Sequence, residues 1–437
     1  MSTTRRQFIA SASTAAAAPF ILPGSRAMGE ERSTLRTIRL GHIGTGGRGG
    51  ALLRNFTSAP GARSVAVCDP FEDRRASASA HIKETQGHTP KSYADFRELL
   101  ADPRIDAVVI ATPDHWHTEI GIAAVAAGKD VYLEKPLGYT LAQNQEMLAA
   151  CESSGRFFQY GTQQRSQEII HRGMELVLNG TIGDIERIEM WCPEGKGGGS
   201  LDEIPVPGGL DYNLFIGPAP MRPPTKDRLT MEASWYCADY AIGFIAGWGA
   251  HPLDIAIWGQ NYDLQGLYKI KGTGHVATPD ALFNTITSWD VQMEFAGGIH
   301  ARFMSRDLAE PVVRAYCGET FRGDGTTFFG SKGWISLSRS GASASNPEWL
   351  RQRIPPESAR LPYLRNWYHA FVECVRERKP SPGTIQEAVR SDAMSHLSAI
   401  AIESGQEITW DPNAYRIVSH NPLNEKMTTP TRDWQNT

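Results

Sequence analysis

The stretch from Ala107 to Pro136 constrains the fold of this chain more than any other. It reads AVVIATPDHWHTEIGIAAVAAGKDVYLEKP, an apolar run rich in β-branched residues, a helical segment that ends at Gly128, and a second short apolar run. This pattern predicts strand, helix, strand. Such a β-α-β unit requires two parallel strands, so the residues that follow the strands meet at one edge of the sheet. In open α/β sheets ligands bind at that edge.

Polar and aromatic residues follow both predicted strands. We expect the following to be neighbours in space and to contact a bound cofactor: Thr112, Pro113, His115, Trp116, His117, Glu134, Lys135 and Pro136. A free lysine titrates near about 10.4, and partial desolvation beside a cofactor lowers that pKa toward neutral. Lys135 is therefore our candidate for proton transfer.

Length and composition limit the classes of protein that fit. At 437 residues the chain is too long for one compact core, which predicts two domains. The formal net charge is −4, and without a long basic run a nucleic-acid partner is not expected. The six cysteines form no C-x-x-C pair, so neither a zinc site nor a disulfide framework is signalled. We expect no membrane span in the mature form, because no segment approaches about 20 uninterrupted apolar residues.

The first residues predict an export signal. TRRQFI at residues 4–9 is a twin-arginine pattern, a modest apolar stretch follows to residue 22, and SRA at 25–27 offers a small-residue cleavage site. We therefore expect a Tat signal over residues 1–27, with the Tat machinery as a partner and a periplasmic location. The alternatives are a disordered Ala-rich tail or an uncleaved anchor.

A glycine-rich loop follows the first predicted strand, residues 37–43. Its residues are Gly44, Thr45, Gly46, Gly47, Arg48 and Gly49, in G-x-G-x-x-G spacing. Gly44 permits a tight turn, Gly46 lets the backbone approach a pyrophosphate, and Gly49 lets the next helix pack closely on the strand. Amides at the start of that helix would bind the phosphates. The loop is therefore a candidate dinucleotide site.

Asp69 ends the second apolar strand, residues 64–68. A carboxylate there can accept hydrogen bonds from both ribose hydroxyls and would repel a 2′-phosphate, which favours NAD over NADP. Arg74 lies close enough in sequence to help bind a phosphate, so NADP stays possible.

Together these motifs resemble the Gfo/Idh/MocA oxidoreductase family, which includes glucose-fructose oxidoreductase and inositol dehydrogenase. The resemblance rests on GHIGTGGRGG, VAVCDP, the VVIATP to EKP stretch, LFIGPAP and WGAHPLDIAIWG. It implies an α/β fold with an N-terminal NAD(P)-binding Rossmann domain, expected over residues 36–160. It also implies a C-terminal α/β domain over residues 161–411, built on a large open, mixed, mainly antiparallel sheet. Such a sheet often mediates oligomers, so we expect a dimer or tetramer.

The residues themselves fit this division. After residue 161 the rapid β-α alternation gives way to alternating runs, and helical periodicity returns over residues 361–404. A polar arm is expected over residues 412–437. The long Gly/Pro-rich passage from Glu194 to Pro224 could line a cleft or bury an oligomer surface.

The resemblance also implies roles for two catalytic residues. Lys135 corresponds to a lysine that contacts the reacting oxygen, with a proline that is commonly cis after it. His251 corresponds to a histidine that faces the substrate in many members, paired with an aspartate four residues earlier. This chain has Gly247 at that position, so the trio is incomplete. Asp254 could orient the imidazole or merely complement the helix dipole.

Other residues are candidates for contacts with the substrate. A bidentate arginine and aromatic faces suit polyols and sugar acids, which singles out Arg165, Tyr236 and Tyr240 besides Asp254. His115 and His117 could also be read as metal ligands, but no further ligand stands at a telling spacing, so no metal is expected.

These expectations combine into one function. The sequence predicts an exported, NAD(P)-dependent oxidoreductase acting on a sugar, sugar acid or cyclic polyol, with a tightly bound and internally recycled cofactor. Two alternatives stay open. One is an enzyme that cleaves glycosides by transient oxidation and elimination, and the other is a non-catalytic sugar-binding protein on the same fold.

Overall fold

A parallel sheet forms the first part of the chain. In the computed structural model the described residues are 36–436, and the predicted signal over residues 1–27 lies outside them. The six strands pair in the order β3-β2-β1-β4-β5-β6, and every pairing is parallel. They are β1 Ile38–Ile43, β2 Ala62–Cys68, β3 Lys91–Tyr93, β4 Ala107–Ile110, β5 Asp130–Leu133 and β6 Phe158–Tyr160. The predicted Rossmann-type sheet is confirmed.

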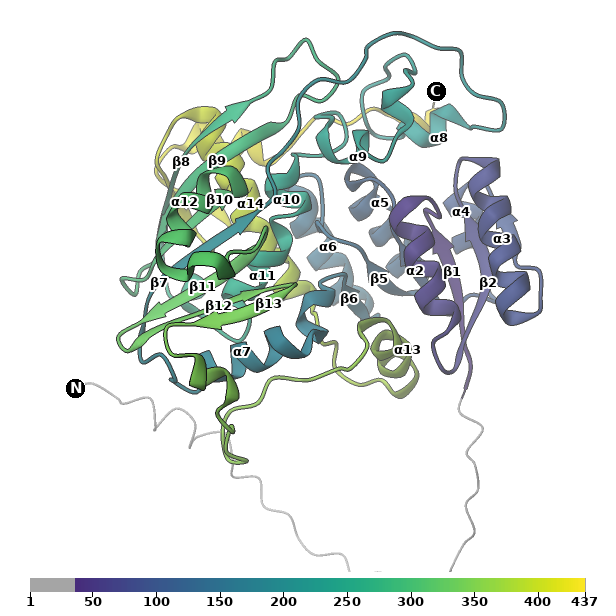
Figure 1. Ribbon diagram of the computed structural model, residues 1–437. Helices are drawn as coiled ribbons and strands as arrows, with labels where there is room; N and C mark the ends of the chain where they lie inside the picture. Colours follow the sequence, from purple (N-terminus) through teal and green to yellow (C-terminus); the bar gives the residue numbers. More distant parts are fainter. Residues whose placement is uncertain (1–35, 437) are drawn as a thin grey trace, which may run out of the picture. The chain divides into compact units, whose positions relative to one another are not determined.

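Helices cover both faces of this sheet (Figure 1). They are α2 Gly47–Thr57, α3 Glu72–Gln86, α4 Phe96–Leu100, α5 Asp114–Ala126 and α6 Leu141–Ser154. Local sequence explains where they begin and end. α6 begins with a capping box between Thr140 and Gln143, in which each side chain binds the other residue's backbone N–H. It ends at Gly155, which adopts the left-handed conformation that glycine permits.

The second sheet has nine strands and is mixed. Their order is β13-β12-β11-β7-β10-β9-β8-β14-β15, and only β7 and β10 pair in parallel. The strands are β7 Ile185–Cys192, β8 Tyr268–Val276, β9 Ile286–Glu294, β10 His300–Ser305, β11 Gly325–Gly330, β12 Gly333–Ser338, β13 Gly341–Ala344, β14 Ile408–Asp411 and β15 Arg416–Ile417. The expected large, mainly antiparallel sheet is therefore confirmed.

Helices pack on this second sheet and connect it to the first. α7 Glu168–Leu178, α11 Ala250–Ile257 and α14 Ile385–Ser404 join its main core, whereas α12 Arg306–Cys317 packs in a separate cluster with Trp191 and Met304. α14 contacts both β8 and α6, so it links the two sheets.

Helix α13, Trp367–Glu377, crosses back to the first sheet. Its residues Trp367, Phe371 and Val375 share a core with Leu40 and Phe56. The helical stripe was expected among the late helices of the second domain, but its apolar face completes the core of the first. A periodic stripe identifies the buried face of a helix without identifying its partner.

The passage between β7 and α11 lies against the first domain. It carries α8 Tyr212–Ile216, α9 Ala233–Tyr236 and α10 Phe244–Gly247. Before α8 it pairs with the loop after β2, through a bridge between Phe71 and Leu210 and a hydrogen bond from Glu72 N–H to Gly209 O at 2.9 Å. This chain path places α8 beside the carboxyl edge of the first sheet.

The sequence predicts neither a disulfide framework nor a membrane-spanning helix. All six cysteines are buried and none forms a disulfide. Within residues 36–436, no helix combines the length and apolarity needed to cross a bilayer.

Arg165 lies at the junction of the two domains and is almost fully buried, at 2% exposure. Its guanidinium donates to both carboxylate oxygens of Asp254, at 2.7 and 2.5 Å, and to Glu387 at 2.9 Å. Thr162 also donates to Asp254, at 2.6 Å. The network therefore joins the chain after β6 to α11 and α14.

Replacing Arg165 with alanine should lower the free energy of unfolding by about 3–5 kcal/mol, because it leaves the buried Asp254 carboxylate without its counter-charge. Arg351→Ala is the control, since its pair with Glu348 is exposed and should contribute less than about 1 kcal/mol. Denaturant unfolding measures both. Equal effects of the two substitutions would contradict the buried network.

Candidate active site

The glycine loop forms a cradle at the start of α2. Gly44 has a φ of +79°, and a Cβ on Gly49 would lie 1.9 Å from the Gly44 carbonyl oxygen. Both positions therefore require glycine. No acidic residue lies in the first turn of α2, so the free amides at its N-terminus remain favourable for an anion.

Asp69 lies at the end of β2, beside this cradle. Its carboxylate is buried and accepts hydrogen bonds from the Thr45 N–H at 2.8 Å and the Phe71 N–H at 3.0 Å. Burial raises its pKa despite these bonds. Arg74 stacks on the Phe71 ring, and its guanidinium lies 4.0 Å from the carboxylate. A buried carboxylate and a cation therefore lie side by side at the end of β2, and their contact with a ribose or a phosphate stays a prediction.

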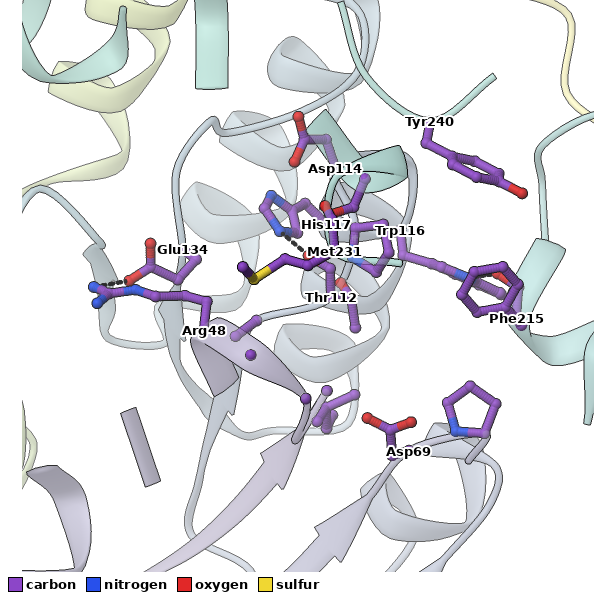
Figure 2. Close-up of a pocket in the computed structure, with 18 of the residues that line it drawn as sticks. Arg48, Asp69, Thr112, Asp114, Trp116, His117, Glu134, Phe215, Met231 and Tyr240 are labelled. Carbon is purple, nitrogen blue, oxygen red and sulfur yellow. Dashed lines mark hydrogen bonds and ion pairs between the residues drawn. The ribbon is translucent and has the colours of Figure 1, made fainter. Parts of the chain in front are cut away.

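A cleft of about 1270 Å³, counting the open space at its mouth, runs along this edge of the sheet (Figure 2). The predicted cofactor contacts that line it are Gly44, Gly46, Gly47, Arg48, Asp69, Arg74, Thr112, Pro113, Trp116, His117, Glu134 and Lys135. The second domain contributes Leu214, Phe215, Met231, Trp235 and Tyr240. In Figure 2 Asp69 and Glu134 lie on different sides of the cleft, and Met231 lies between them.

These features fit a dinucleotide. A side chain at residue 44 or 49 would collide with neighbouring backbone, so the tight cradle depends on both glycines. Asp69 lies where such a fold would place the adenosine half. Phe96 and Trp116 line the same cleft, and Phe215, whose carbonyl accepts from Trp116, packs edge-on against Phe71 beside Asp69. The lysine and glutamate after β5 mark the opposite half, where the second mononucleotide of such folds lies.

Lys135 extends from the end of β5 toward the second domain. Its ammonium donates a hydrogen bond to the Gly247 carbonyl at 2.5 Å. Desolvation lowers its pKa, outweighing the opposite influence of the Glu134 and Asp114 carboxylates. The peptide bond from Lys135 to Pro136 is cis. The amine is thus held in place and partly deprived of the solvent that stabilises its charged form.

Glu134 is paired across the cleft edge with Arg48. The guanidinium donates to Glu134 Oε1 at 2.7 Å, and Tyr132 donates to the same oxygen at 3.3 Å. The other oxygen, Oε2, is buried and has no hydrogen-bond partner within residues 36–436. This oxygen is available to a ligand that carries a donor.

His251, at the start of α11, lies near Lys135 but does not itself line the cleft. Its side chain is 3% exposed, its ring lies 5.3 Å from that of Trp248, and its Nδ1 has no hydrogen-bond partner in the described part of the chain. Burial lowers its pKa, and the positive charges of Lys135, Arg339 and Arg48 lower it further. The imidazole is therefore neutral near pH 7 and can accept a proton or donate one hydrogen bond.

Gly247 replaces the aspartate that the family resemblance implies. A Cβ at this position would meet only the Phe244 ring, at 3.8 Å, and the backbone adopts no left-handed conformation there. The position therefore has room for a side chain. In this protein the backbone carbonyl of Gly247, rather than a carboxylate, binds the lysine.

His117 joins the two ends of the β-α-β unit. Its ring nitrogens lie 2.9 Å from the Thr112 carbonyl oxygen and 2.7 Å from that of Pro136. Burial lowers its pKa. Both nitrogens are thus occupied by the backbone of the site. Among the described residues no group of three or more His, Cys, Asp or Glu could hold a metal ion.

Other predicted contacts lie away from the cleft. His115 is buried and stacks on Tyr240, with ring centroids 4.8 Å apart, and it does not line the cavity. Tyr236 packs on Phe244 and Phe283 instead of lining it. Only Tyr240 of the two tyrosines reaches the cleft.

Arg165 and Asp254 were expected to contact substrate, but they bind each other at the domain junction. The two nitrogens that would clamp a substrate carboxylate, Nε and Nη2, already bind Asp254. The structure therefore gives these side chains an architectural role. The positions of Arg165 and Asp254 in the sequence could not show whether the arginine binds a ligand or a carboxylate on another helix.

Arg339 is a candidate that the sequence did not indicate. It lies in the turn between β12 and β13, and its guanidinium is 4.5 Å from the Trp248 ring. In the amide orientation that satisfies both groups, Gln164 accepts from it at 3.1 and 3.2 Å. Its backbone N–H donates to Asp324 at 3.4 Å, and among residues 36–436 its guanidinium forms no ion pair within 4 Å. Because Trp248 also contacts His251, this cation lies beside the candidate catalytic residues.

Comparisons with known proteins agree with this geometry. Residues 38–162 match the model of the GFO_IDH_MocA oxidoreductase family, NAD-binding Rossmann fold. The first domain therefore matches the NAD-binding Rossmann fold that this family model describes. The match covers the strands and loops that line the cleft on the side of the first sheet.

Relatives and solved structures extend the comparison. A myo-inositol 2-dehydrogenase of Thermotoga maritima is 33% identical over 181 residues, 41% of this chain and 52% of that protein. A glycosyl hydrolase family 109 protein of Solibacter usitatus is 35% identical over 126 residues, 28% of this chain and 29% of that protein. The chain thus spans about half or less of the length of these relatives.

The structure of scyllo-inositol dehydrogenase from Lactobacillus casei with bound NAD(H) and scyllo-inositol covers 86% of this chain and 99% of its own. The TM-score is 0.57 at 16% identity. The likeness shows that both domains share their fold with that protein.

Gly247→Asp should raise the pKa of Lys135 by about 1 unit or more, because a carboxylate close to an ammonium stabilises its charged form. Gly247→Asn adds nearly the same volume without charge and should leave that pKa near its value in the parent protein. The measurement is the pH dependence of Lys135 acylation by a trace reagent, followed by peptide mass spectrometry. An equal shift in both variants would show that the added volume, not the charge, controls the lysine.

Proposed function

We propose that this protein is an NAD(P)-dependent oxidoreductase that transfers a hydride between nicotinamide and a carbinol or carbonyl carbon of a sugar, sugar acid or cyclic polyol. The observation that carries the proposal is the partly desolvated Lys135 amine, which opens into a cleft formed by an NAD-binding Rossmann domain. The names of the inositol dehydrogenase relatives support the class of substrate.

In this proposal Lys135 transfers the proton, and Gly247 and His251 position the amine and the substrate. Neutral Lys135 takes the proton of the substrate hydroxyl at Nζ while the carbinol carbon gives up a hydride, so the two losses produce a carbonyl group. The bond to the Gly247 carbonyl directs the amine. His251, uncharged and beside Trp248, supports it by binding the substrate hydroxyl or by exchanging a proton with it. Bound nicotinamide supplies the hydride chemistry.

The dinucleotide would lie with its phosphates on the amides of Gly46, Gly47 and Arg48 and its adenosine ribose at Asp69. NAD is the preferred form, and Arg74 keeps NADP possible. We further propose that the cofactor stays bound and is recycled within the protein. The twin-arginine sequence at residues 5–6 supports this, since that route exports folded proteins and free NAD is scarce outside the cytoplasm.

Export to the periplasm and assembly into a dimer or tetramer belong to the same proposal. The sequence of residues 1–27 supports export, and the large open sheet typical of the family supports assembly. Fractionation of the host cell and sedimentation of the mature protein test these two points.

A second candidate function is glycoside cleavage by transient oxidation and elimination. The glycosyl hydrolase family 109 names among the relatives favour it. Product analysis distinguishes the two, because cleavage of an aryl glycoside releases the phenol, whereas simple oxidation leaves a keto-sugar. We rank oxidation first because this chain retains the EKP lysine.

Lys135→Ala should keep its dinucleotide and lose turnover by about 10²- to 10⁴-fold, the usual contribution of a general acid–base group. Lys135→Arg should not restore turnover, because a guanidinium stays protonated. The assays are turnover with sugars and polyols and release of dinucleotide from the denatured protein. A folded parent protein without stoichiometric dinucleotide would contradict the retained cofactor, and turnover within tenfold in Lys135→Ala would contradict the role of the lysine.

Substitution of Arg339 tests whether the protein prefers acidic over neutral carbohydrates. A substrate carboxylate bound to this cation should contribute about 1.5–3 kcal/mol, so Arg339→Gln should raise the KM for a sugar acid by roughly 10- to 100-fold. The KM for a neutral polyol such as an inositol should change much less, which makes that substrate the control. Equal changes for both substrates would assign Arg339 a structural role.

A further inference from the structure

The C-terminal tail, residues 428–436, returns to the first domain and ends beside α8 (Figure 1). Trp434 is only 4% exposed although its neighbours in sequence are polar. Its ring lies 4.8 Å from that of Trp116 and 6.2 Å from that of Phe96, both edge-on or tilted. Its indole N–H donates to Glu119 at 2.8 Å. The expected polar arm is therefore anchored by a buried aromatic residue.

The tail also binds the passage that carries α8. The Arg432 side chain donates to the Gly217 carbonyl at 3.0 Å and to the Asn213 side chain at 2.7 Å, and its backbone N–H donates to Pro218 O at 2.9 Å. Asn213 in turn donates to the Trp434 carbonyl at 3.3 Å. One short segment thus connects α8 with α4 and α5.

Two of the residues that the tail touches, Phe96 and Trp116, line the cleft, and Asn213 lies next to two residues of α8 that line it. Phe96 and Trp116 line it from the first domain, and Leu214 and Phe215 of α8 line it from the second. The Trp116 indole N–H lies 3.4 Å from the Phe215 carbonyl. A Cβ on Gly217 would lie 2.0 Å from the Trp116 ring, so the two walls are in direct contact there.

We propose that the tail is a latch that retains the dinucleotide by fastening α8 over its adenosine half, with Trp434 and Arg432 as positioning residues. This inference rests on the proposed function, because it takes a dinucleotide to be the occupant of the cleft. It adds the element that controls how long the dinucleotide stays.

The physical argument concerns the path of release. Because the walls touch at Gly217 and Trp116, an adenine bound deeper in the cleft, beside Asp69, would leave past α8 when α8 separates from α4 and α5. The segment just before α8 is bound to the first domain through Glu72 and Phe71. The tail binds residues within and just after α8, so the helix is held from both of its ends. Separation then requires Trp434 to leave its contacts with Trp116 and Phe96. Removing a buried aromatic anchor lowers this barrier.

The experiment uses the full-length protein loaded with NADH and follows loss of the bound NADH fluorescence after a large excess of NAD is added. Trp434→Ala and Arg432→Ala should each release NADH at least about tenfold faster, which corresponds to about 1.4 kcal/mol. Trp434→Phe should be intermediate, because it keeps a ring but loses the hydrogen bond to Glu119. Lys426→Ala, which breaks an exposed pair with Glu403 just before the tail, is the control and should be unchanged.

Measuring the affinity for each half of the cofactor separately distinguishes a latch on the adenosine half from a general destabilisation of the cleft. AMP should bind the Trp434→Ala variant about tenfold more weakly, whereas reduced nicotinamide mononucleotide should bind within twofold of the parent protein. Equal loss for both halves, or an unchanged NADH release rate in both alanine variants, would overturn the latch. A parent protein that binds no dinucleotide would overturn the proposed function and the latch together. Release unaffected by the variants in a protein that does bind NADH would overturn the latch alone.

Discussion

The ion pair between Arg48 and Glu134 is the interaction on which the rest of the site depends. It ties the first turn of α2, where phosphates would bind, to the end of β5, where the candidate base follows. Desolvation lowers the pKa of Lys135, the carboxylates of Glu134 and Asp114 act in the opposite direction, and the positive charge of Arg48 lowers it further. The same contact therefore fixes the geometry of the cleft and tunes its reactive amine.

Residues of the second domain contact the glycine loop and Lys135 at the carboxyl edge of the first sheet. The Gly247 carbonyl holds the lysine amine, and Met231 lies so close to the glycine loop that a Cβ on Gly47 would be 2.3 Å from its sulfur. Desolvation of Lys135 is thus a product of both domains. The buried network around Arg165 and Asp254 matters for function in this indirect way, since it fixes α11, which carries His251, relative to the end of β6.

The sequence predicts the first domain well because its signals are local. The glycine spacing, the acid after β2 and the lysine after β5 each follow from where a parallel strand ends. Tertiary partners are not encoded in this way. Nothing in the periodicity of α13 indicates that it packs on the first sheet, and nothing near Arg165 indicates that Asp254 would occupy it. Arg339 lies in an ordinary polar turn and Trp434 in a polar tail, and only the folded chain brings Arg339 against Trp248, beside His251, and Trp434 against Trp116, which lines the cleft.

The contacts by which the second domain covers the cleft connect the proposed retention of the cofactor with the proposed chemistry. The contacts of Gly247 and Met231 that enclose Lys135 and the glycine loop would also cover a bound dinucleotide, so a protein that exchanged its cofactor in every cycle would have to undo this desolvation each time. Internal recycling removes that requirement, because only the smaller carbohydrate needs to enter and leave. The tail supports the same solution, since it fastens α8 over the adenosine half, remote from the reacting carbon. A cleft whose α8 wall is fastened by the tail, with Lys135 among the residues that line it, would suit a resident cofactor and an exchanging substrate.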